Sequence, residues 1–159
     1  MSPITLLPAR AVSEAKKALS EVMDEVVREH RPQVVQRNDW KDAMALISLE
    51  DLRSVVSSFR FDPRVTYGLA EVVLSLDQMG LVASGPSLEA AADTLVLELR
   101  EYCADLIGRF DYFRYTKRAR DLPWVLRFSL ASPEEQRELL FEEPGGLPEP
   151  AREQLAASR

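Results

Sequence analysis

The chain has 159 residues, 46% of them hydrophobic and 29% charged, which is the composition of one globular domain or of two small ones. One cysteine and one histidine exclude an intrachain disulfide and a zinc site made of Cys and His ligands, and no apolar stretch reaches the roughly 18 residues that span a bilayer. The net charge of −6 argues against nucleic acid, yet residues 1–41 carry seven basic and six acidic side chains, whereas residues 42–159 carry thirteen and twenty. The distribution of charge is therefore compatible with DNA binding by the N-terminal part. The first ten residues lack the pattern of a secretory signal, so we expect a cytoplasmic protein.

The first 60 residues contain the patterns of both strands and helices. Apolar side chains from Val12 to Val26 recur at spacings of three and four, which is typical of an amphipathic helix, and Pro32 limits its length. Ser48, followed three residues later by Asp51, is typical of a helix N-terminus. The segment predicts, in chain order, a strand at 4–8, a helix at 14–29, a β-hairpin from strands at 33–36 and 42–47, and a helix at 49–59.

The next segment predicts a third helix and a linker. Asp62 and Pro63 resemble a cap and a first-turn proline, and the apolar residues that follow have helical spacing, so we expect a helix from 63 to 79 that ends at Gly80. The run Ser84-Gly85-Pro86-Ser87 has the composition of a linker. We place the boundary between two modules there.

The remainder of the chain is predicted to be helical. Apolar residues from Leu88 to Phe113 predict a helix of about 27 residues, and two shorter helices are expected at 122–130 and 133–141. Residues beyond Glu142 are rich in proline, glycine and charge, and predict a flexible tail. The fold class is therefore α+β: a β-α-β-β-α-α module at 1–80, an all-helical module at 87–142, and an acidic tail at 143–159. The N-terminal part is small, so we expect it to dimerise through its strands.

Three separate blocks of the N-terminal third resemble the Phd/YefM antitoxin family. They are residues 13–23 (SEAKKALSEVM), 34–38 (VVQRN) and 45–52 (ALISLEDL). The resemblance implies a homodimer that binds palindromic operator DNA, represses its own operon, and uses its C-terminal segment to bind and block a cognate toxin. By position, Lys16 matches a basic residue early in the first helix of the family, and Arg37 matches the basic residue at the hairpin turn. With the neighbouring Arg10 and Lys17, they form the predicted DNA-binding set.

The chain departs from the family pattern at two places. Its hairpin turn, from Asn38 to Lys41, lacks the usual glycine, and residues 87–142 resemble a folded module where the family commonly has a short tail. The second departure favours an alternative function, a stand-alone dimeric transcription regulator with a helical sensor or oligomerisation domain. A third possibility is an adaptor that has kept the dimer and lost DNA binding.

Two groups of residues in the C-terminal half each allow two interpretations. Aromatic residues at helical spacing form either the core or a surface that contacts the toxin; this predicted partner-binding set is Tyr102, Phe110, Phe113, Trp124 and Phe128. The run from Arg114 to Arg120 holds four basic residues and a tyrosine, which fits a nucleic-acid-binding patch or the cationic end of a long helix.

Nothing in the sequence indicates catalysis. His30 has no nucleophile motif near it and no glycine-rich phosphate loop is present, so we expect neither an enzyme nor a cofactor or metal. Cys103 lies beside the apolar face of the long helix, and we expect it to be buried. The three N-terminal blocks make an antitoxin, with operator DNA and a toxin as partners, the favoured function.

Overall fold

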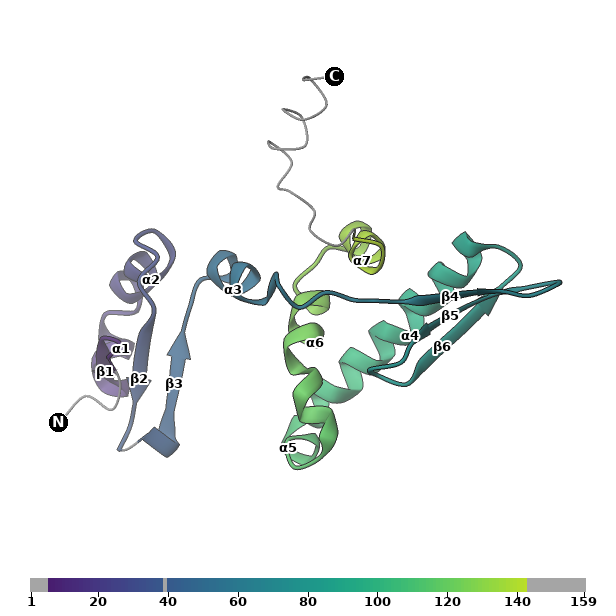
Figure 1. The fold of residues 1–159 in the computed structure, drawn as a ribbon. Coiled ribbons are helices and arrows are strands. Elements are labelled where there is room, and N and C mark those ends of the chain that lie inside the picture. The colour runs from purple at the N-terminus through teal and green to yellow at the C-terminus, as the bar shows by residue number, and fades with distance from the viewer. Residues whose placement is uncertain (1–5, 39, 143–159) are drawn as a thin grey trace, which may run out of the picture. The chain divides into compact units, whose positions relative to one another are not determined.

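The computed structural model describes residues 6–38 and 40–142 (Figure 1). The chain divides into two compact units, unit 1 at Met1–Val56 and unit 2 at Ser57–Arg159. Each unit has a small three-stranded sheet and helices, so the α+β class predicted from the sequence is confirmed.

Unit 1 is built around strand β2, which is central in a mixed sheet. The elements are β1 (Ala9–Ala11), α1 (Val12–Lys17), α2 (Leu19–Val27), β2 (Gln33–Gln36), the 3-10 helix η1 (Trp40–Asp42), β3 (Ala43–Leu46) and α3 (Leu49–Val56). Strand β2 pairs with β1 in parallel and with β3 antiparallel. Val34 and Val35 of β2 are buried, as are Val22 and Val26 of α2.

Most predicted elements of unit 1 are present, with shifts that have local causes. The hairpin is confirmed, with Gln33 opposite Leu46, and α3 follows Ser48, whose hydroxyl accepts a hydrogen bond from the Asp51 N–H at 3.1 Å. The first helix is split at Ala18, whose φ and ψ of −118° and 34° are not helical. The strand predicted at 4–8 begins instead at Ala9, because Pro8 has no N–H for a ladder; residues 4 and 5 lie outside the described part.

Unit 2 packs helices on an antiparallel sheet. Its elements are β4 (Arg64–Tyr67), β5 (Val72–Leu76), β6 (Leu81–Gly85), α4 (Leu88–Gly108), α5 (Phe110–Phe113), the 3-10 helix η2 (Lys117–Asp121), α6 (Leu122–Ser129) and α7 (Pro133–Leu140). Helix α4 packs against β5 and β6 (Figure 1) and also contacts α6 and α7. Leu74, Leu95 and Phe128, from the sheet, α4 and α6, are buried in the same core.

The segment before β4 is fastened to α6. The Trp124 Nε1–H donates to the Arg60 carbonyl at 2.8 Å, and the Arg127 guanidinium donates to the Phe59 carbonyl at 3.0 Å. The Phe61 ring packs edge-to-face on Phe128 with centroids 6.1 Å apart. The start of unit 2 therefore lies against a helix near its end.

The prediction of a third helix at 63–79 is wrong. The segment forms strands β4 and β5, joined by a turn in which the Gly68 N–H donates to the Glu71 carbonyl at 2.8 Å. Buried Val72, Leu74 and Leu76 alternate with less buried neighbours along β5, which is a period of two. The apolar residues of this segment therefore fit a helical spacing of three and four and a strand spacing of two at the same time, and the chain forms strands.

The helices predicted after residue 87 are confirmed, but they share a core with the sheet. Helix α4 ends at Gly108, and a separate short helix, α5, follows it, where one longer helix was expected. The predicted linker at Ser84–Ser87 contains the end of β6 and the N-cap of α4, in which Ser87 accepts from the Ala90 N–H at 3.1 Å. The observed division into units falls between Val56 and Ser57.

Candidate functional site

Three of the four predicted DNA-binding residues of unit 1 are exposed. Lys16 and Lys17 end helix α1, and Arg37 directly follows β2. Ala15 is the buried residue of α1, so the lysines that follow it lie on the outer side of the helix. Positive charge at the C-terminal end of a helix also interacts favourably with the helix dipole.

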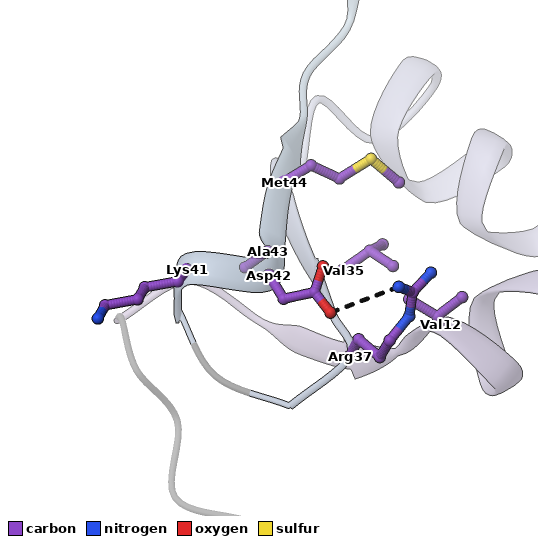
Figure 2. A pocket seen from close by; sticks show the side chains of 7 residues that line it. All are labelled: Val12, Val35, Arg37, Lys41, Asp42, Ala43 and Met44. Carbon is purple, nitrogen blue, oxygen red and sulfur yellow. Dashed lines mark ion pairs between the residues drawn. The ribbon is translucent and has the colours of Figure 1, made fainter.

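A shallow cavity of about 270 Å³ lies next to Arg37 (Figure 2). It is lined by Val12, Val35, Arg37, Lys41, Asp42, Ala43 and Met44. The Arg37 Nη1 lies 3.5 Å from the Asp42 Oδ2, and the Arg37 side chain lies beside Val12 (Figure 2). The fold therefore brings Val12, at the start of α1, beside Arg37, which is 25 residues later in the chain. Lys16 lies one helical turn after Val12, on the same face of α1, and a shared DNA surface of Lys16 and Arg37 stays a prediction.

Arg10 has a different environment. Its guanidinium lies 2.5 Å from the Glu25 Oε1 and 3.9 Å from the Glu21 Oε1, and only 25% of its side chain is exposed. The hydrogen bond from Arg10, more than its charge, lowers the pKa of Glu25, which also accepts from the Gln33 side-chain amide. Arg10 therefore joins β1 to α2, and its contact with DNA stays a prediction.

Helix α2 carries an exposed apolar surface that the sequence analysis missed. Leu19, Met23 and Val27 are 56%, 56% and 51% exposed and are spaced four residues apart, so they form one row, here called the α2 apolar stripe. The apolar spacing of three and four between Val12 and Val26 includes Leu19 and Met23 together with the buried Val22 and Val26, although the two pairs lie on different faces of α2. The constant spacing of four was the signal that could have separated the two rows.

The predicted partner-binding aromatics lie in or against the core of unit 2. Tyr102, Phe113 and Phe128 are buried, and Phe110 and Trp124 are partly buried against them. The Tyr102 hydroxyl donates to the Asp121 Oδ2 at 2.6 Å. Their position fits the core interpretation, and a direct contact with a toxin stays a prediction.

Cys103 and His30, the other two residues considered in the sequence analysis, both have contacts within the fold. Cys103 is buried, as expected, and burial raises the pKa of its thiol to about 11. The His30 Nδ1 lies 3.1 Å from the Asp51 Oδ2, and hydrogen bonds from Ser48 and then His30 lower the pKa of Asp51. Within residues 6–38 and 40–142, no cluster of three or more His, Cys, Asp or Glu residues is placed to hold a metal ion. In the same ranges, the longest apolar helical stretch falls short of what a membrane crossing requires.

Comparisons with known proteins point to one family. The model of a PHD-like family, described as the antitoxin of toxin–antitoxin, RelE/RelB, TA systems, matches residues 6–141. A solved structure from Syntrophomonas wolfei subsp. wolfei, described as an antitoxin part of a proposed toxin/antitoxin system, has a TM-score of 0.77 and 23% identity to this chain. The match covers 86% of this chain and 99% of that one, and at this identity it shows a shared fold. No curated protein sequence matches the chain.

Proposed function

Because the chain belongs to the PHD-like antitoxin family, we propose that it neutralises a cognate toxin by direct binding and represses its own operon by binding operator DNA as a homodimer. The match of the family model over residues 6–141 carries this proposal. The exposed surfaces of unit 1 support the operator and dimer parts, and the presence of a second compact unit supports the toxin part.

Operator binding is assigned to the surface that holds Lys16, Lys17 and Arg37. Lysine side chains at the end of α1 can neutralise phosphates, and Arg37 can bind a phosphate or a guanine edge with two parallel hydrogen bonds. The Arg37–Asp42 pair is exposed, with 68% and 47% of the two side chains accessible. An exposed pair of this kind is weak, so Arg37 can exchange its partner for DNA at little cost.

Dimerisation is assigned to the α2 apolar stripe and the free edge of β3. Within the described sheet, β3 pairs with β2 on one side and has no strand on the other. Exposed Met44 on β3 adds apolar surface to this unit. A unit of this size has a small core, and a second copy would bury the stripe and pair the edge. Two copies would also present Lys16 and Arg37 twice, which fits the two half-sites of a palindrome.

Toxin binding is assigned to unit 2. Outside residues 109–120, its described residues 57–142 carry five basic and thirteen acidic side chains. An acidic surface complements a toxin with a basic active site, and exposed Leu97 and Ile107 of α4 provide apolar contacts beside it.

The experiment is an anisotropy titration of the full chain on its own upstream promoter at two salt concentrations. We expect the double variant K16A/R37A to bind more weakly. The slope of the logarithm of affinity against the logarithm of salt concentration should become less steep by about 0.9 for each phosphate contact removed. R28A/R31A removes the same charge from exposed ion pairs elsewhere in unit 1 and serves as the matched control. Both variants should still bind the toxin that is encoded by the gene adjacent to the one for this protein. Equal affinities of K16A/R37A and the control would refute the operator surface, and no wild-type binding at low salt would refute operator binding.

A stand-alone regulator is the second candidate, and the folded core of unit 2 favours it. The two functions differ in one result. An antitoxin restores growth of cells that express the adjacent toxin, whereas a stand-alone regulator binds the promoter without rescuing growth or forming a complex with the neighbouring gene product.

A further inference from the structure

The surface of unit 2 formed by α5 and η2 combines positive charge with exposed aromatic rings. Its exposed basic and aromatic residues are Tyr112, Arg114, Tyr115, Lys117, Arg118 and Arg120, here called the α5–η2 basic surface, and Asp111 is exposed beside them. Tyr112 and Tyr115 are 63% and 81% exposed, unlike the buried Tyr102 and Phe113 of the same region. The surface therefore offers both cations and flat rings to the solvent.

The charge of this surface is opposite to that of its surroundings. Residues 109–120 carry five basic side chains and one acidic one, Asp111, whereas the rest of 57–142 carries five basic and thirteen acidic. Such a local excess focuses the field on one place and attracts an anionic partner to it. A cationic partner would be repelled, and an uncharged partner would gain nothing from the charge.

Two of the cations are available to a partner. In the part of the chain that the structure describes, neither Arg114 nor Lys117 has a carboxylate within ion-pair distance. Arg120 lies 3.9 Å from Asp121 and its side chain is 72% exposed. The anionic groups that Arg114 and Lys117 lack among the described residues can be supplied by a partner.

The surface rests on a well-packed base. The Arg118 guanidinium lies over the rings of Tyr102 and Phe113, 5.2 and 5.3 Å from their centroids. Thr116 caps η2 by accepting from the Arg118 N–H at 3.2 Å, and its hydroxyl donates to the Phe113 carbonyl at 2.8 Å. A surface held in this way loses little conformational entropy when it binds a ligand.

The exposed rings favour nucleic acid over an acidic protein as the anionic partner. The Arg114 guanidinium lies 5.1 Å from the centroid of the Tyr115 ring, so a cation and an aromatic ring are placed together in solvent. Phosphates need only the cations, but unpaired bases have flat faces that stack on tyrosine and arginine. In a duplex these faces are already stacked on one another, which leaves them inaccessible to Tyr115.

We propose that the α5–η2 basic surface binds a single strand of nucleic acid, with Arg114, Lys117 and Arg120 contacting phosphates and Tyr112 and Tyr115 stacking on unpaired bases. The ligand chemistry is common to RNA and single-stranded DNA. The proposal does not depend on operator binding, since the operator surface belongs to unit 1 and its ligand is duplex DNA.

The test is a fluorescence anisotropy titration of the full chain with labelled 12-nucleotide oligo(U), oligo(dT) and a blunt DNA duplex of random sequence, at low and high salt. We expect single strands to bind more tightly than the random duplex, and the ratio of oligo(U) to oligo(dT) affinity to show which of these two kinds of strand is preferred. R114Q/K117Q should lower the logarithmic salt slope by about 1.4, which corresponds to two phosphates of a single strand. Y115L should weaken binding roughly tenfold by removing one stacking ring.

Matched controls separate this surface from the rest of the protein. R64Q/R137Q removes two exposed cations from unit 2 outside the surface, and Y67L removes an exposed tyrosine from β4. K16A/R37A should bind the single strands as the wild type does, even if it has lost the operator. The proposal is overturned if single strands do not bind, if the controls weaken binding as much as R114Q/K117Q and Y115L do, or if poly-glutamate competes equally with oligo(U).

Discussion

Asp121 is 4% exposed and depends on two neighbours for its hydrogen bonds and charge balance. The Tyr102 hydroxyl donates to its Oδ2 at 2.6 Å, and the Arg120 Nε lies 3.9 Å from its Oδ1. Burial, and then the hydrogen bond to Asp121, raises the pKa of Tyr102. The phenol therefore remains a neutral donor, and the contact joins α4 to η2.

Replacing Tyr102 with phenylalanine should destabilise unit 2 by roughly 1–3 kcal/mol, because the buried Asp121 loses its donor. Urea unfolding of the wild type and Y102F measures this difference. The control is Y112F, which removes the hydroxyl of an exposed tyrosine and should change stability by less than about 0.5 kcal/mol.

The pH dependence gives an independent check of the same contact. A raised pKa in the folded state means that the stabilisation is complete below the ordinary phenol pKa of about 10 and is lost above it. The stability advantage of the wild type over Y102F should therefore shrink as the pH rises above that value. A constant difference between the two proteins would contradict the role given to Tyr102.

At this scale the sequence predicted burial better than it predicted partners. The helical spacing of Tyr102 and Phe113 correctly allowed a core position, and Cys103 is buried as expected. The partner of Arg10 was not predictable, because Glu25 is 15 residues away on another element. An ion pair between elements depends on how the chain folds back, and residue spacing does not contain that information.

At the scale of elements, β6 and α4 meet at a glycine. A Cβ on Gly85 would lie 2.6 Å from the Ala91 backbone nitrogen and 2.8 Å from the Ala90 Cβ. Gly85 is paired with Val72 and ends the strand where the first turn of α4 begins. The close approach of strand and helix therefore requires a residue without a side chain.

Replacing Gly85 with alanine should cost roughly 1–3 kcal/mol, because the clash is with backbone atoms that cannot move independently of α4. Thermal unfolding followed by circular dichroism measures the loss. Gly108 is the matched position, since a Cβ there meets nothing within 4 Å and it lies at the end of α4. G108A should be neutral or stabilising by up to about 1 kcal/mol; equal effects at the two glycines would contradict the close approach.

The elements of unit 1 were more predictable than the sheet of unit 2. Ser48 and the two runs around residues 33–47 carry signals that occur in one kind of element, and their predictions are confirmed. Residues 63–79 carry two signals, and the wrong one was chosen. Gly68 and Gly80, the latter with φ of 67°, lie at the turns of a strand meander, and Val72 and Val73 favour a strand.

At the scale of the whole molecule, the division into two units predicts two unfolding transitions. Unit 1 should unfold at a temperature that rises with protein concentration, because its proposed dimer is favoured by mass action, whereas unit 2 should not respond. The tryptophans allow the two to be followed separately, since Trp40 belongs to unit 1 and Trp124 to unit 2. W124F and W40F each leave one reporter.

Placing a charge in the α2 apolar stripe tests the origin of this dependence. M23E should abolish the effect of concentration on unit 1, because Met23 is 56% exposed in the single chain and is buried only in the proposed dimer. L97E, at a residue of unit 2 that is 58% exposed, is the control and should leave the effect unchanged. A transition of unit 1 that is independent of concentration in the wild type would rule out the dimer.

The sequence did not predict the point along the chain at which unit 1 ends and unit 2 begins. Ser84-Gly85-Pro86-Ser87 has the composition of a linker, yet it joins a strand to the helix that covers it. Turn residues indicate that the chain changes direction, and they do so equally between domains and inside one. The division after Val56 depends on which apolar faces pack together, and this is a property of the whole chain.

The attachment of Phe59 and Arg60 to α6 also affects the order in which the chain folds during its synthesis. Their carbonyls accept hydrogen bonds from Arg127 and Trp124, 68 and 64 residues later in the chain. The N-terminal end of a chain leaves the ribosome first. All residues of unit 1 are therefore available while the carbonyls of Phe59 and Arg60 still lack the donors Arg127 and Trp124. The closing of unit 2 must wait for α6, and during that interval the nascent protein presents a finished unit 1 together with an open unit 2.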